Sequence, residues 1–126
     1  MTLMLDTSVA IHLRDGDPDI QERISTTSEA VVLPMIALVE LEGGVRGDER
    51  DLRRARLDVL LKTVEVKPFL TADARAYGEI VNTAGFSRRK VLDRMIAAQA
   101  ITAGATLVTR NGDDFRDIPG LTLLEW

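Results

Sequence analysis

The segment Leu3–Ser8, LMLDTS, decides the fold of this chain. Its three apolar residues stop at a carboxylate, which is the pattern of a short buried strand closed by a polar residue. Thr7 or Ser8 can then cap a helix that continues through residues 9–13. Asp6 would stand at the carboxyl end of a strand, where open α/β sheets bind ligands. A cap or turn role for Asp6 is the simpler explanation of this segment taken alone.

Short apolar runs alternate with helical patterns along the rest of the chain. We expect further strands at residues 30–33, 64–66, 106–109 and 121–124. Helices are expected at residues 18–26, 35–46, 48–61, 71–84 and 91–103, with Thr71 capping the fourth of these. This alternation predicts an α/β fold, a short parallel sheet flanked by helices, in a single domain over residues 1–126.

The composition narrows the possible functions. The chain has 126 residues, of which 45% are hydrophobic and 29% charged, as in an ordinary soluble protein. It has no cysteine, which excludes disulfides and thiolate zinc sites and favours a cytoplasmic location. No signal peptide is evident, and no apolar run approaches the roughly 18 residues of a membrane span. The net charge of −4 argues against nucleic-acid binding through overall charge, but not against a nuclease with an acidic metal centre.

Four regions carry acidic residues at structural boundaries. Asp6 ends the first strand, Glu40 lies in the helix after the second, Asp93 lies early in the helix before the fourth, and Asp113 and Asp114 follow the fourth. Because the carboxyl ends of parallel strands share one edge of the sheet, residues after the first and fourth strands meet if those strands are neighbours.

Helical periodicity orients two of these acids. Glu40 and Glu42 are about 200° apart around a helix, so they cannot both face one site, and Glu40 shares the face of Ile36. Asp93 continues a face of small residues, which would hold it at the rim of a close helix–sheet contact. Taken alone, Asp93 is explained as well by a favourable interaction with the helix N-terminus.

Carboxylates that converge without basic partners repel one another unless they bind cations or change their pKa values. With a single histidine and no cysteine, a metal site here must consist of oxygen ligands, which favours Mg²⁺ or Mn²⁺. Such an ion retains waters, one of which can attack a phosphodiester. Thr7 or Ser8 could donate a hydrogen bond to a phosphate or to a metal-bound water.

The chain resembles the PIN domain, and more narrowly the VapC-type toxins of bacterial type II toxin–antitoxin pairs. The resemblance covers essentially the whole chain and rests on four motifs in the family's order: Asp6-Thr7-Ser8, Val39-Glu40-Leu41, Asp93-x-x-Ile96-Ala97-Ala98 and Val108-Thr109-Arg110-Asn111-x-x-Asp114-Phe115. It implies a PIN-like three-layer sandwich and a Mg²⁺- or Mn²⁺-dependent endoribonuclease.

The resemblance also implies the site residues and partners. Asp6, Glu40 and Asp93 would form the acidic core. Asn111 replaces the family's usual fourth acid, so Asp114 is implied in its place, while Asn111 and Asp113 remain alternatives. A homodimer, a VapB-like antitoxin that blocks the acidic pocket, and a structured RNA substrate, with tRNA among the usual targets, are implied as well.

Arg88, Arg89, Lys90 and Arg110 are the basic residues best placed to contact RNA phosphates near the acids. Two rival functions are open. One is a metal-dependent nuclease of the same fold that cuts DNA. Cleavage of DNA instead of RNA by the purified protein would distinguish it from an endoribonuclease. A non-catalytic α/β interaction module, such as a response regulator, would need a lysine after a late strand, and none follows residues 106–109.

Overall fold

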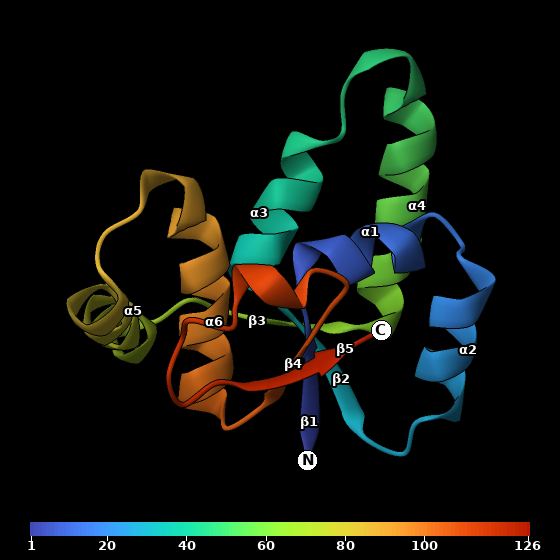
Figure 1. Cartoon of the computed structure of the whole chain (residues 1–126). Coiled ribbons are helices and arrows are strands. Elements are labelled where there is room, and N and C mark those ends of the chain that lie inside the picture. Colours follow the sequence, from blue (N-terminus) through green and yellow to red (C-terminus); the bar gives the residue numbers. More distant parts are fainter.

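The computed structural model describes residues 1–126 and contains a five-stranded sheet in the order β3-β2-β1-β4-β5, with every neighbouring pair parallel (Figure 1). The strands are β1 (Thr2–Leu5), β2 (Ala30–Pro34), β3 (Glu65–Lys67), β4 (Thr106–Thr109) and β5 (Thr122–Glu125). The helices are α1 (Thr7–Arg14), α2 (Pro18–Thr26), α3 (Met35–Gly43), α4 (Arg50–Thr63), α5 (Thr71–Ala84) and α6 (Val91–Ala103). The predicted α/β fold is confirmed.

The central strand β1 pairs with β2 on one side and with β4 on the other, so that Met4 lies between Val32 and Leu107. These three side chains are buried. Strands covered on both faces consist of nearly continuous apolar residues, which is why the short apolar runs of the sequence identify them.

The chain crosses the sheet in two directions. It moves from β1 outward through β2 to β3, and then returns past β1 to β4. Because parallel crossovers are right-handed, α1, α2 and α4 cover one face and α5 and α6 cover the other. Figure 1 shows α5 and α6 on the left and α2 and α4 on the right. The reversal places a topological switch point between β1 and β4, where α/β folds bind ligands.

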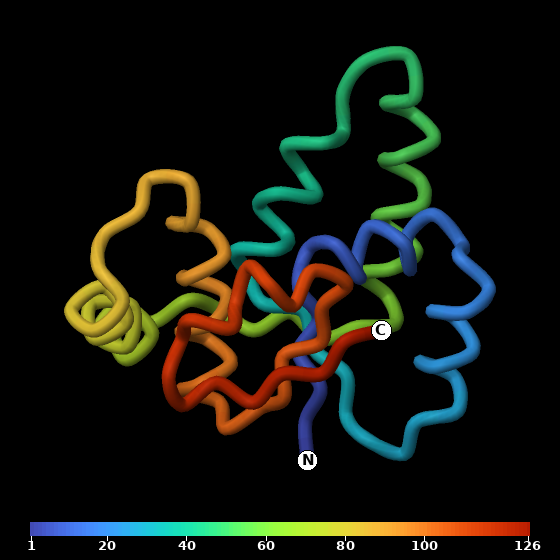
Figure 2. The backbone as a smooth tube through the Cα atoms, viewed as in Figure 1, coloured from blue at the N-terminus to red at the C-terminus, as the bar shows by residue number.

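Three short helical turns complete the connections: η1 (Gly47–Glu49), η2 (Arg88–Lys90) and η3 (Gly112–Asp114). The segment from η3 to β5, red in Figure 2, leads from the end of β4 back to the level of its start, where Thr122 pairs with Thr106. None of the helices combines the length and apolar character that a membrane crossing requires.

Two helix caps differ from the prediction. Asp6, and not Thr7 or Ser8, caps α1, because its carboxylate accepts a hydrogen bond from the backbone N–H of Val9 at 3.1 Å. Thr71 begins α5 without capping it. Asp73 instead closes that helix end, since its carboxylate accepts a hydrogen bond from the N–H of Leu70 at 2.7 Å.

The helix expected over residues 35–46 ends earlier, at Gly43. The carbonyl of Gly44 leaves the helical pattern and accepts a hydrogen bond from Arg53 Nη1 of α4 at 3.0 Å. Adjacent glycines weaken a helix by roughly 1 kcal/mol each relative to alanine, which favours a helix end at this position. The chain then turns through Gly47, whose φ of +74° suits glycine, before α4 begins.

Candidate active site

Asp6 lies at the carboxyl end of β1 and is only 4% exposed. Its Oδ1 accepts hydrogen bonds from Ser8 Oγ at 2.6 Å and from the N–H of Val9 at 3.1 Å. Its Oδ2 accepts one from Thr109 Oγ1 at 2.6 Å. Asp6 therefore has both roles that the sequence suggested as alternatives: it caps α1, and it faces the edge of the sheet where the other acids meet.

Glu40 projects from α3 toward the start of α1, where Thr7 Oγ1 donates a hydrogen bond to its Oε1 at 2.7 Å. Glu42 points elsewhere, because Arg54 of α4 holds it through two hydrogen bonds of 2.6 and 3.0 Å. The hydrogen bond from Arg54 lowers the pKa of the exposed Glu42 carboxyl below its ordinary value. The structure thus separates the two glutamates as periodicity predicted, with Glu40 at the candidate site.

Asp93 is half-buried in the first turn of α6. Its pKa rises from 3.8 to about 6, mainly because burial disfavours the charged form. The negative charges of Asp114, Glu40 and Asp6 raise it further, in that order, and Lys90 opposes them. Residues far apart in the sequence therefore share one electrostatic site with Asp93.

The segment after β4 offers two adjacent acids, and the structure distinguishes them. Asp113 points into solvent with its side chain 89% exposed and forms an ion pair with Arg116. Asp114 is the charge that acts most strongly on Asp93. Of these two alternatives, Asp114 is the one that faces the other acids.

Thr109 is a site residue that the sequence motif contains but that residue patterns did not single out. It is fully buried at the end of β4, donates to Asp6 and accepts a hydrogen bond from the N–H of Asn111 at 2.9 Å. The N–H of Arg110 donates to Ser8 Oγ at 3.2 Å. These contacts join the ends of β1 and β4. Leu5 and Val108 are opposite each other on β1 and β4, and Asp6 and Thr109 directly follow them. A hydroxyl residue at this strand end is the signal that could have identified Thr109.

The predicted RNA contacts divide into two groups. Arg88, Arg89 and Arg110 are exposed and form no ion pair. Lys90 is held by Asp117, with its Nζ 3.4 Å from the carboxylate Oδ2. The unpaired cations nearest to the acids in the sequence are therefore the three arginines.

The donor set suits a hard divalent cation, because all four groups are carboxylates. After burial, the repulsion from the other three is what raises the pKa of Asp93. No three of the chain's His, Asp or Glu side chains, however, lie at the mutual spacing of a complete ligand set. Mg²⁺ retains several waters and binds through as few as one or two carboxylates, so the chemistry of the donors fits the ion without such a set.

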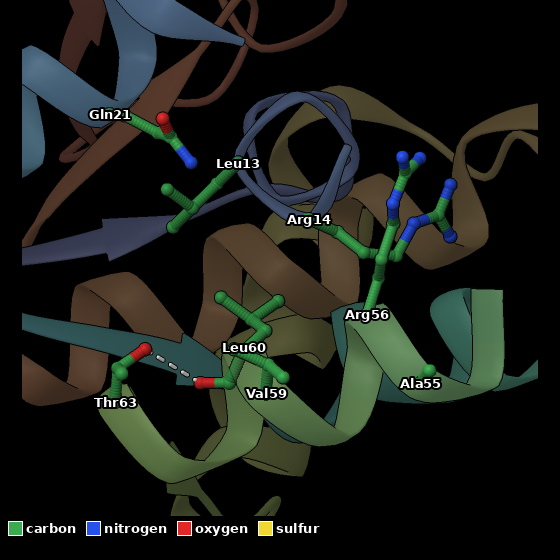
Figure 3. A pocket seen from close by; sticks show the side chains of 8 residues that line it. All are labelled: Leu13, Arg14, Gln21, Ala55, Arg56, Val59, Leu60 and Thr63. Carbon is green, nitrogen blue, oxygen red and sulfur yellow. Dashed lines mark hydrogen bonds between the residues drawn. The ribbon is translucent and has the colours of Figure 1, made fainter. Parts of the chain in front are cut away.

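A separate groove of about 370 Å³ lies between α1, α2 and α4 (Figure 3). Leu13, Leu60 and Val59 give it an apolar wall, and Arg14 and Arg56 stand side by side at one end. Val59 is 62% exposed, a large fraction for a valine. None of the four carboxylates lines this groove, so it is distinct from the acidic site.

Comparison with known proteins defines the class to which this fold and site belong. The family model described as "PIN domain" matches residues 3–121. The chain therefore belongs to the PIN-domain family, and within it to the VapC-type toxins.

The proteins similar to this chain include several VapC nucleases. Ribonuclease VapC1 of Rickettsia felis is 31% identical, with the alignment covering 98% of this chain and 96% of the relative. A Salmonella typhimurium protein named tRNA(fMet)-specific endonuclease VapC is 29% identical over 100% of this chain and 98% of its own. Among solved structures, VapBC2 from Rickettsia felis bound to a promoter DNA fragment has a TM-score of 0.88 and 28% identity, covering 100% of this chain and 99% of the other.

Proposed function

We propose that this chain is a divalent-metal-dependent endoribonuclease and the toxin of a toxin–antitoxin pair. The observation that carries the proposal is the convergence of Asp6, Glu40, Asp93 and Asp114 at the switch point between β1 and β4. Its sign is the pKa of Asp93, which burial raises most and which the charges of Asp114, Glu40 and Asp6 raise further, to about 6. The names of the VapC relatives, which are ribonucleases, support the choice of reaction.

The chain's own residues would divide the work as follows. When bound, a divalent cation supplies a water of lowered pKa and positive charge against the transition state of phosphodiester hydrolysis. Asp6 and Glu40 would bind the ion or its waters from fixed positions, because Thr109 and Thr7 orient their carboxylates. Asp93, with a pKa of about 6, would hold a proton at pH values below 6, and a bound cation would favour its ionised form.

Structured RNA, and tRNA in particular, is the proposed substrate class. Arg88, Arg89 and Arg110 offer unpaired guanidinium groups, which match phosphate geometry well. With aromatic residues at 4% of the chain, recognition through shape and backbone is favoured over stacking of many bases. The Salmonella typhimurium relative, named for tRNA(fMet), supports the choice of tRNA.

The test compares two glutamates on one helix. Purified wild type, Glu40→Gln and Glu42→Gln are incubated with total tRNA and with single-stranded DNA, in Mg²⁺ and in EDTA. We expect metal-dependent cleavage of RNA by wild type and Glu42→Gln, and none by folded Glu40→Gln. Cleavage of DNA alone would favour the DNA-directed alternative. RNA cleavage that persists in EDTA or in Glu40→Gln would contradict the proposal.

We also propose a VapB-like antitoxin as partner, supported by the similar structures described as VapBC complexes. The apolar groove of Figure 3 is the candidate contact, because an amphipathic helix can bury its apolar face against Val59 and Leu60. Co-purification with the product of the adjacent small gene tests this. Val59→Asp should weaken the complex, whereas Leu124→Asp, at an exposed leucine of β5, should not.

A homodimer is proposed as the assembly. Val39, Phe86 and Leu92 are exposed large apolar residues, and Val39 and Leu92 each precede a candidate site acid in the sequence. Such residues favour burial in a protein contact. Light scattering should give about twice the 13.9 kDa of one chain, and a monomer at micromolar concentration would contradict the proposal.

A further inference from the structure

Arg94 is a buried arginine directly after Asp93 in α6, and no expected role accounts for it. Its side chain is only 3% exposed. Nη1 donates to the carbonyl of Gly85, before η2, and Nη2 lies 3.4 Å from Asp117 Oδ2. Nε is buried without a hydrogen-bond partner. Arginine is rarely buried this deeply, and an unpartnered buried donor is costly, so packing alone is a poor explanation for this residue.

The partner of Arg94 connects it to the candidate site. Asp117 follows Asp114 by three residues, on the segment between η3 and β5. Lys90 also approaches Asp117, with Nζ 3.4 Å from the same oxygen. The two cations flank Asp93 along the chain, three residues before it and one after. Both therefore bind the segment that carries Asp114 to the helix that carries Asp93.

This bridge opposes a repulsion. Asp93 and Asp114 carry like charges that face each other across the site, so nothing between these two carboxylates holds their segments together. The attraction of Lys90 and Arg94 for Asp117 acts on the same two segments, within three residues of Asp93 and of Asp114 along the chain. Because Arg94 is buried and donates to the carbonyl of Gly85, it provides a fixed partner for Asp117.

We propose that Arg94, assisted by Lys90, is a positioning residue that holds Asp117 and thereby sets the separation of Asp93 and Asp114 for a divalent cation. The inference rests on the proposed function, because it assigns the bridge to the same metal site. In this role Arg94 touches neither the metal nor the substrate. It acts through the segment it holds.

The test measures Mn²⁺ binding by isothermal titration calorimetry, without RNA. Asp117→Asn is the main variant, because the Asp117 side chain is 43% exposed and its loss should leave the fold intact. Asp58→Asn is the matched control, since Asp58 also pairs with an arginine, Arg54, on α4. We expect Asp117→Asn to bind Mn²⁺ about tenfold more weakly than wild type, which is the usual size of a supporting-residue effect. Asp58→Asn should bind as wild type does.

Two further variants separate positioning from general stability. Asp117→Glu keeps the charge and should recover most of the affinity, whereas Arg94→Lys keeps the charge but loses the forked geometry and should not. Thermal unfolding without metal should rank these variants differently from their Mn²⁺ affinities. Equal affinities of wild type and Asp117→Asn would overturn this inference alone. Absence of Mn²⁺ binding by wild type would overturn the proposed function together with it.

Discussion

Asp6 and Glu40, on the β1 side of the site, accept hydrogen bonds from protein donors, whereas Asp93 and Asp114, on the α6 side, accept none. The first pair is oriented before any ligand arrives. The second pair is held by its backbone and by the ion pairs of Asp117, and burial and repulsion raise the pKa of Asp93. Hydrogen bonds within the fold therefore orient one half of the site, whereas the other half keeps a repulsion between carboxylates that Lys90 only partly opposes.

The largest expected effect comes from removing a charge on the organised side. Asp6→Asn should reduce RNA cleavage to the level seen in EDTA, because the amide cannot replace a carboxylate toward a cation. The fold should persist, since asparagine caps helices as well as aspartate does. Urea unfolding should show a loss of about 1–3 kcal/mol, because one donor among Ser8, Val9 and Thr109 loses its acceptor. Wild-type cleavage by the folded variant would remove Asp6 from the proposed site.

The next effect tests whether orientation of Asp6 matters apart from its charge. Thr109→Val removes the hydroxyl that donates to Asp6 Oδ2 while keeping the shape of a fully buried side chain. We expect a loss of about 1–3 kcal/mol of unfolding free energy and a lower cleavage rate with all four acids intact. Thr106→Val on the same strand is the control, because its hydroxyl contacts only the sulfur of Met1 at 3.4 Å. Equal effects of the two substitutions would contradict a special role for Thr109.

The sequence predicts the β1 side of the site more completely than the α6 side. The strands, the parallel sheet and the inward direction of Glu40 can be predicted from the spacing of apolar residues and from the polar residues that end each apolar run. Both features reflect which residues are buried locally. The choice between Asp6 as a cap and Asp6 as a site residue could not be made locally, because the structure uses it for both.

Asp93 and Asp114 are predicted from the sequence, but the contacts around them are not, because these contacts join residues far apart in the chain. The sequence predicts Lys90 as an RNA contact and gives no indication that it also pairs with Asp117, which is 27 residues away. The choice of Asp114 over Asp113 depends on the turn η3, in which Arg116 takes up the charge of Asp113. Single-residue patterns contain no signal for such pairings. The resemblance to the PIN family supplied Asp114 where periodicity could not.

A smaller effect concerns the pH dependence of the α6 side. The pKa of Asp93 in the folded chain, about 6, lies above its ordinary value of 3.8. Ionisation of Asp93 therefore destabilises the metal-free fold at pH values above 6, and this penalty disappears as the pH falls from 6 toward 3.8. Asp93→Asn should unfold at a higher temperature than wild type at pH 7.5 in EDTA, with the difference narrowing through that window. Mg²⁺ should raise the Tm of wild type and not of the variant. A difference that does not change with pH would contradict the raised pKa.

The smallest effect compares two adjacent acids by what each does to Asp93. Asp114→Asn should lower the pKa of Asp93, because the Asp114 charge is the strongest of the three that raise it. Asp113→Asn should leave that pKa unchanged, since Asp113 points into solvent and pairs with Arg116. Carboxyl NMR titration of Asp93 in the metal-free protein measures both. Burial, the largest cause of the shift, remains in both variants, so the pKa should stay above 3.8 even without Asp114. If Asp113→Asn produced the larger change, the segment after β4 would present the other acid to the site, and the assignment of the fourth carboxylate would be reversed.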